Sequence, residues 1–272
     1  RYLDIWDRIR SEAESISDTE PFFYAYIHEV IIDHRSLSSS LGYLLSSKLA
    51  SSGVNATALQ EIFAHAFEDD SSIVHSVLYD LEAIFMRDPA ATSYVIPYLF
   101  YKGFHALESY RVAHRLWRND RKAVSYYIQN RVSEVFAIDI HPAAHIGHGI
   151  FIDHGTSIVI GETSVIENNV SMLHEVTLGG TGKECGDRHP KIREGVLIGA
   201  GAKILGNIEI GRNAKVGSGS VVVRDVHAHV TVAGVPARGV GRADTLSPAL
   251  SMSQELPVIP SGVNGSVLDF QI

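Results

Sequence analysis

An aspartate and a histidine stand 15 residues apart in the segment DIHPAAHIGHGIFIDHG, at Asp139 and His154. A hydroxyl group is a weak nucleophile at neutral pH, and a histidine held by a carboxylate can remove its proton while the oxygen attacks a thioester. A single histidine in such a segment can equally be a structural or surface group. The pair is therefore one candidate for general-base catalysis.

A second candidate is the glycine-rich and charged segment GGTGKECGDRHPKIREG, residues 179–195. Within it, Arg188 suits bidentate binding of a carboxylate, and the adjacent His189 could assist. A solvated surface loop would have a similar composition, so both interpretations stay open. Cys185, the only cysteine of the chain, is interpreted as an incidental thiol because no histidine is paired with it in the sequence.

Two further sets of residues have a structural alternative. Asp88 precedes a proline, as a helix N-cap does, but its carboxylate could also hold an ammonium group. Three histidines, His141, His145 and His148, could suggest zinc. Their spacings of four and three place them on different faces of one coil, so we predict no metal site.

The second half of the chain has a hydrophobic period of six, which is typical of a parallel β-helix. Each unit supplies a short strand and a turn, and three units close one triangular coil. In a coil of about 18 residues, Asp139 and His154 would lie on successive turns near one corner, where they could form a hydrogen bond. The frame slips by two after Ile152, and a 20-residue gap follows Leu178. The aliphatic positions are Ile140, Ile146, Ile152, Ile160, Ile166, Met172, Leu178, Ile198, Ile204, Ile210, Val216 and Val222.

The first half has helical spacing of apolar residues, as in Leu41, Leu44, Leu45 and Leu49, with Asn55 as a predicted N-cap. After the repeats, the composition turns to Ser, Pro and Gly, which is typical of a flexible segment. We predict an α+β chain: an all-helical domain at 1–137, a left-handed parallel β-helix carrying the catalytic residues at 138–240, and a flexible tail at 241–272.

The composition and charge of the chain limit the kinds of partner that we expect. A net charge of -8 and a pI near 5.9, without a basic stripe, argue against nucleic acid. No run reaches the roughly 18 apolar residues of a membrane span, and no signal or transit segment is recognisable, so we expect a cytoplasmic protein. The chain begins with Arg1, and an organellar form whose transit segment has been removed stays open.

Several motifs together resemble serine acetyltransferases, and some of their wording is similar to that of plant members. The resemblance covers nearly the whole chain, and DIHPAA and GDRHPKI are more specific than the hexapeptide pattern. It implies acetyl transfer from acetyl-CoA to L-serine, the first committed step of cysteine biosynthesis, without a metal. The motifs are RDPA, DIHPAA, IDHGTSIVIGET, VTLGGTGK, GDRHPKI, IGAGAKILGNI and AGVPAR.

The resemblance also implies roles for individual residues. His154 would be the general base and Asp139 its orienting partner. Serine would be bound by Asp88, Asp153, Arg188 and His189, with the aspartates facing its ammonium group and the arginine its carboxylate. Acetyl-CoA would lie in a groove between neighbouring β-helices, in contact with Gly180, Ala200, Gly201 and Lys215.

The resemblance further implies that the chain forms homotrimers paired into hexamers and is inhibited by L-cysteine. It also implies that the C-terminal Ile272 docks into O-acetylserine sulfhydrylase. Two other functions stay open: a hexapeptide-repeat O-acetyltransferase that acts on a sugar or drug hydroxyl, and a protein that mainly regulates the sulfhydrylase. The pairing of Asp88 with Arg188 favours a zwitterionic amino acid as the acceptor. The presence of Asp139, His154, Arg188 and His189 argues for an active enzyme.

Overall fold

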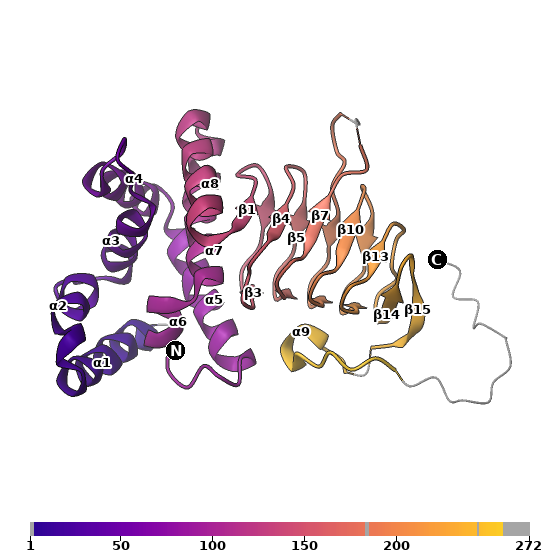
Figure 1. The fold of residues 1–272 in the computed structure, drawn as a ribbon, viewed down its shortest axis with the longest axis horizontal. Helices are drawn as coiled ribbons and strands as arrows, with labels where there is room; N and C mark the ends of the chain where they lie inside the picture. Colours follow the sequence, from indigo (N-terminus) through magenta and orange to yellow (C-terminus); the bar gives the residue numbers. More distant parts are fainter. Residues whose placement is uncertain (1–2, 183–184, 244, 258–272) are drawn as a thin grey trace, which may run out of the picture. The chain divides into compact units, whose positions relative to one another are not determined.

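The computed structural model describes residues 3–182, 185–243 and 245–257 and divides the chain into two compact units, Arg1–Ile138 and Asp139–Ile272 (Figure 1). The first unit is helical and the second is a parallel β-helix. No helix of the described residues is long and apolar enough to cross a membrane.

The helical unit is held together by the apolar faces that the sequence predicts. Leu41, Leu44, Leu45 and Leu49 are at most 2% exposed. The side chain of Asn55 accepts a hydrogen bond from Ala58 N–H at 2.9 Å, which confirms the predicted N-cap. The elements are α1 (Leu3–Thr19), a 3-10 turn (Pro21–Phe23), α2 (Tyr24–Ile27), a π-helical turn (His28–Ile32), α3 (Leu37–Leu49), α4 (Ala56–Asp69), α5 (Ser71–Arg87), α6 (Val95–Phe100), α7 (Lys102–Arg118) and α8 (Lys122–Phe136).

A buried cluster of charged side chains joins α5 to α7. Arg111 Nε donates a hydrogen bond to Asp80 Oδ2 at 3.1 Å and lies 3.2 Å from Glu108 Oε2. Both carboxylates are fully buried. Burial raises the pKa of Glu108 well above its usual value, and the neighbouring Asp80 charge raises it further. The helical core therefore contains a carboxyl group that favours its protonated form.

The second unit is a parallel β-helix of three sheets, as the period of six predicts. Each of the first four coils contributes one strand to each sheet, in the order A, B, C along the chain. The last coil adds strands to sheets A and C alone, and the final strand of sheet C runs antiparallel to its neighbour. Sheet A contains β1 (Ile138–Ile140), β4 (Ile158–Ile160), β7 (Thr177–Gly179), β10 (Lys203–Leu205) and β13 (Val221–Val222). Sheet B contains β2 (His145–Ile146), β5 (Val165–Ile166), β8 (Lys191–Ile192) and β11 (Glu209–Ile210). Sheet C contains β3 (Phe151–Ile152), β6 (Ser171–Met172), β9 (Leu197–Ile198), β12 (Lys215–Val216), β14 (Val230–Gly234) and β15 (Ala237–Arg242).

The recurring aliphatic side chains fill the axis of the coils. Nearly all are buried, and Ile146 in β2 is half-buried. The structure adds Ile192, six residues before Ile198, to this series and buries it completely. The repeat therefore resumes at β8, and the segment that leaves the coil is shorter than residues 179–195. Figure 1 shows this loop standing out after β7.

Residues 245–257 lie along sheet C. They include α9 (Pro248–Ser251), whose Ala249 carbonyl accepts a hydrogen bond from Ser171 Oγ at 2.8 Å. Lys215 in β12 is 1% exposed, and its Nζ donates to the carbonyl groups of Ser253 and Glu255. This part of the chain therefore covers the Lys215 side chain.

Candidate active site

His154 projects from the corner between sheets C and A. It follows β3 in a left-handed backbone conformation, with φ of 57°, and its side chain is 74% exposed. Its Nε2 lies 3.7 Å from Asp153 Oδ1, and its ring centroid is 5.8 Å from that of His174. The imidazole is thus open to a ligand and has a carboxylate beside it, which are the features that a general base needs.

The structure does not bring Asp139 into hydrogen-bond contact with His154. Among the described residues, the only carboxylate that His154 pairs with is that of Asp153. The predicted contact assumed a coil of about 18 residues, but Phe151 pairs with Ser171, so this coil has 20 residues. Asp139 lies in β1 of sheet A, whereas His154 lies at the corner that follows β3. Its charge acts instead on His141, whose pKa is lowered by burial and raised in part by Glu162 and Asp139.

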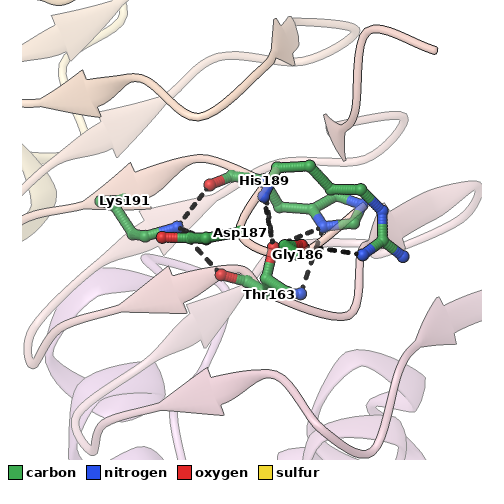
Figure 2. Close-up of polar contacts among 6 residues, drawn as sticks. Thr163, Gly186, Asp187, His189 and Lys191 are labelled. Atoms are coloured by element: carbon green, nitrogen blue, oxygen red, sulfur yellow. Dashed lines mark hydrogen bonds and ion pairs between the residues drawn. The ribbon is translucent and has the colours of Figure 1, made fainter. Parts of the chain in front are cut away.

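Arg188 and His189 lie at a different corner, between sheets A and B. Figure 2 shows how the loop that carries them is tied to Thr163, in the turn that follows β4. Thr163 Oγ accepts hydrogen bonds from the backbone N–H groups of Arg188 and His189, both at 3.0 Å. Lys191 Nζ closes the loop by donating to Asp187 Oδ1 and to the carbonyl groups of Thr163 and His189.

The side chains of both residues are fixed by the same turn. Arg188 donates to Glu162 Oε2 at 2.6 Å, and this bond holds the pKa of Glu162 below its usual value. His189 Nδ1 is 2.8 Å from Thr163 Oγ and 3.2 Å from Thr163 N. His189 is 7% exposed, and burial, with the Arg188 charge second, lowers its pKa. The end of the loop at Arg188 and His189 is therefore held in place by Glu162 and Thr163, whereas Gly186 and Asp187 are exposed to solvent.

Gly161 provides the space for the His189 ring. A Cβ at this position would lie 2.0 Å from His189 Cδ2 and 2.1 Å from Nε2, which is far inside van der Waals contact. The three residues Gly161, Glu162 and Thr163 together form the seat of Arg188 and His189. Sequence reasoning gave them no role, although they stand in the quoted motif IVIGET.

The predicted acetyl-CoA residues are divided between the two corners and sheet C. Ala200 and Gly201 lie on the same edge as His154, at the corner between sheets C and A. Gly201 N–H donates to the carbonyl of His174, which lies at this corner in the preceding coil, between Gly201 and His154. Gly180 follows β7, and a Cβ added there would lie 3.6 Å from the Arg188 carbonyl oxygen. Lys215 is on sheet C, with its ammonium group bonded to the carbonyl groups of residues 253 and 255.

Asp88 belongs to the helical unit, and its predicted N-cap role is wrong. It follows α5 as the C-cap residue, and its Oδ1 accepts a hydrogen bond from Ala90 N–H at 2.8 Å. No helix begins at the following proline, because this carboxylate stabilises a tight turn in which the chain leaves α5. The carboxylate is therefore held in a turn between α5 and α6.

Cys185 is exposed, and Ile272 lies outside the described residues. Within the described parts of the chain, no group of three His, Cys, Asp or Glu side chains could hold a metal ion. His174, which sequence reasoning missed, has a buried Nδ1 without a hydrogen-bond partner among the residues described.

Comparison with known proteins gives one family for both units. The family described as "Serine acetyltransferase, N-terminal" matches residues 5–109, and the bacterial transferase hexapeptide family matches residues 189–224. A serine acetyltransferase of Haemophilus influenzae is 51% identical over 262 residues, which are 96% of this chain and 98% of that protein.

Solved structures of serine acetyltransferases are also similar to this chain over most of its length. A serine acetyltransferase in complex with cysteine has a TM-score of 0.92 and 51% identity, over 94% of this chain and 99% of that one. The Brucella abortus enzyme in complex with coenzyme A has a TM-score of 0.87 and 48% identity, over 88% and 96%. The Neisseria gonorrhoeae enzyme in complex with serine has a TM-score of 0.85 and 52% identity, over 86% and 96%. The identity extends over both the helical unit and the β-helix, and the chain belongs to the serine acetyltransferase family.

Proposed function

We propose that this chain transfers the acetyl group of acetyl-CoA to the side-chain hydroxyl of L-serine, which forms O-acetyl-L-serine and CoA for cysteine biosynthesis. The observation that carries the proposal is the identity of 51% to a serine acetyltransferase over almost its full length. The ordered Arg188 and His189 support it, because a cation and an N–H donor suit the carboxylate of an amino acid.

In the proposed mechanism, His154 removes the proton of the serine hydroxyl as the oxygen attacks the thioester carbonyl. The tetrahedral intermediate then collapses, the carbon–sulfur bond breaks, and the imidazolium returns the proton to the departing CoA sulfur. The exposure of the His154 ring supports this role, because both substrates must reach it. Asp139 orients the imidazole, which requires the two side chains to approach when the substrates bind, as catalytic hydrogen bonds often do.

Serine is recognised by its charged groups. Arg188 and His189 bind the carboxylate, and Asp153 and Asp88 face the ammonium group. The position of Asp153 supports its part, because a carboxylate 3.7 Å from His154 Nε2 can hold the substrate nitrogen while the hydroxyl faces the base.

The active site is proposed to form between neighbouring chains. His154 lies at the corner between sheets C and A, whereas Arg188 and His189 lie at the corner between sheets A and B. A second β-helix packed beside the first can bring these two edges together, which supports a homotrimer, paired into a hexamer. The resulting groove would bind acetyl-CoA along Gly180, Ala200, Gly201 and Lys215.

Further partners follow from the family. The complex of a relative with cysteine supports L-cysteine as a feedback inhibitor that competes for the serine site. The tail ending in Ile272 is proposed to dock into O-acetylserine sulfhydrylase, as an apolar C-terminal peptide can. The proposed location is the cytoplasm.

The proposal is tested by following release of the CoA thiol from acetyl-CoA with L-serine, a galactoside and no acceptor. Release that depends on L-serine and is suppressed by L-cysteine is expected. Release with the galactoside but not with L-serine would replace the proposal with a sugar acetyltransferase, and release with neither would leave a binding protein.

A further inference from the structure

The hydrogen bonds of His189 determine which of its ring nitrogens carries a proton. The backbone N–H of Thr163 points at His189 Nδ1, with a distance of 3.2 Å between the nitrogens. A backbone N–H can only donate, so Nδ1 must accept and cannot be protonated. This excludes the imidazolium and the Nδ1-protonated tautomer for the ring in this position.

The hydroxyl of Thr163 agrees with the same assignment. Its oxygen already accepts two hydrogen bonds, from the N–H groups of Arg188 and His189 at 3.0 Å each. A hydroxyl has two acceptor lone pairs and one donor. Its proton can point at His189 Nδ1, 2.8 Å away, or at the Asp187 carboxylate, whose pKa is lowered first by Lys191 and in part by Thr163. The backbone N–H of Thr163 fixes the tautomer, and the hydroxyl contact is compatible with it.

The opposite ring nitrogen is left as a donor. A neutral imidazole with an unprotonated Nδ1 carries its proton on Nε2. Nε2 lies over Gly161, where a Cβ would be 2.1 Å away, and it has no hydrogen-bond partner within the described part of the chain. The lowered pKa of His189 agrees with a neutral ring at physiological pH.

We propose that Thr163 is a positioning residue, which locks His189 as the neutral, Nε2-protonated tautomer and presents that one N–H to the carboxylate of bound serine. This inference rests on the proposed function and adds to it the residue that prepares the serine site. Thr163 needs no contact with the substrate, since it acts through the ring and through the backbone of the loop.

The test compares Thr163→Val with Thr163→Ser in steady-state assays at varied serine and varied acetyl-CoA. Valine matches threonine in shape but lacks the hydroxyl, so the KM for serine should rise by about tenfold or more while the KM for acetyl-CoA changes by less than about twofold. Serine restores the hydroxyl and should bring the KM back to within about threefold of the wild type. Thr231→Val is the matched control, because Thr231 is fully buried and its Oγ has no hydrogen-bond partner in the described residues.

A double-mutant cycle with His189→Ala separates positioning from a general loss of structure. If Thr163 acts mainly through the ring, Thr163→Val should lower kcat/KM for serine strongly in the wild-type background and much less when the ring is absent, because only its bonds to the loop backbone are then lost. Equal losses in both backgrounds, or an unchanged serine KM in Thr163→Val, would overturn the inference. Should the valine variant fail to fold, Thr163→Ala takes its place in the same cycle. A wild-type protein that does not acetylate serine would refute the proposed function instead.

Discussion

Replacing Gly161 by alanine should damage serine binding through a single added methyl group. The new Cβ would lie 2.0 Å from His189 Cδ2, whereas carbon atoms in contact are about 3.5–4.0 Å apart. The ring must therefore retreat by about 1.5 Å or more, which breaks its two hydrogen bonds to Thr163. Gly161 is not among the residues with a positive φ, so its backbone accepts alanine and the effect comes from the ring alone.

The expected magnitude follows from the hydrogen bond that the displaced ring can no longer make. A bond from Nε2–H to a charged carboxylate contributes about 1.5–3 kcal/mol, which corresponds to a loss of about 10- to 150-fold in kcat/KM for serine. The two lost bonds to Thr163 should also lower the free energy of unfolding by about 1–3 kcal/mol.

The assay is the initial rate of CoA thiol release at varied L-serine, with unfolding in urea measured on the same variants. Gly53→Ala is the control, because a Cβ there would meet only Ser51 Oγ, at 4.0 Å. An unchanged kcat/KM for serine in Gly161→Ala would refute the reasoning, since it would mean that the position of the His189 ring has no effect on the substrate.

Three further predictions concern stability. The Asn55→Ala variant loses the cap on Ala58 N–H and should be less stable by about 1 kcal/mol in urea unfolding; an unchanged midpoint would contradict this. Because the pKa of Glu108 is raised in the folded state, the wild type takes up a proton on folding and loses stability as the pH increases. The Glu108→Gln variant lacks this proton uptake, so its Tm should rise relative to that of the wild type between pH 5 and pH 8. A difference in Tm that is constant with pH would show that Glu108 takes up no proton on folding. In Lys215→Met, residues 245–257 lose the ammonium group that binds the carbonyls of residues 253 and 255, so their amide hydrogen exchange should accelerate while that of β9 stays the same.

The β-helix could be predicted from the sequence because its signal is local and repeated. Every coil has to fill the same axis, so the aliphatic residues recur at a fixed period whatever the loops do. Ile192 was missed because the inserted loop interrupts the period of six between Leu178 and Ile192. The pairing of β8 with β5 on one side and with β11 on the other shows that the repeat resumes there.

The candidate site could be predicted in its residue types but not in its contacts. Arg188 and His189 were identified from their chemistry, whereas Thr163, 26 residues from His189, has an ordinary turn composition. Their contact depends on two corners that stack one coil apart, which no local pattern reports.

The contact between Asp139 and His154 stays a prediction for the complex with substrates, and its geometric argument assumed a different coil length. The prediction assumed a coil of about 18 residues, whereas the pairing of Phe151 with Ser171 gives this coil 20 residues. Asp88 was assigned to a helix start because a proline follows it, although the α5 helix ends at the preceding residue. The boundary is decided by the hydrogen bond of Asp88 to Ala90 N–H, and the sequence does not reveal that bond.

The central claim is that the His154 imidazole takes the proton of the serine hydroxyl. The most direct measurement is the rate at which O-acetyl-L-serine appears, followed by mass spectrometry, in the wild type and in His154→Asn at saturating substrates. The account predicts product in equal amount to CoA for the wild type and a loss of about 10²- to 10⁴-fold for the variant, with an unchanged fold. A variant that forms the ester at nearly the wild-type rate would contradict it.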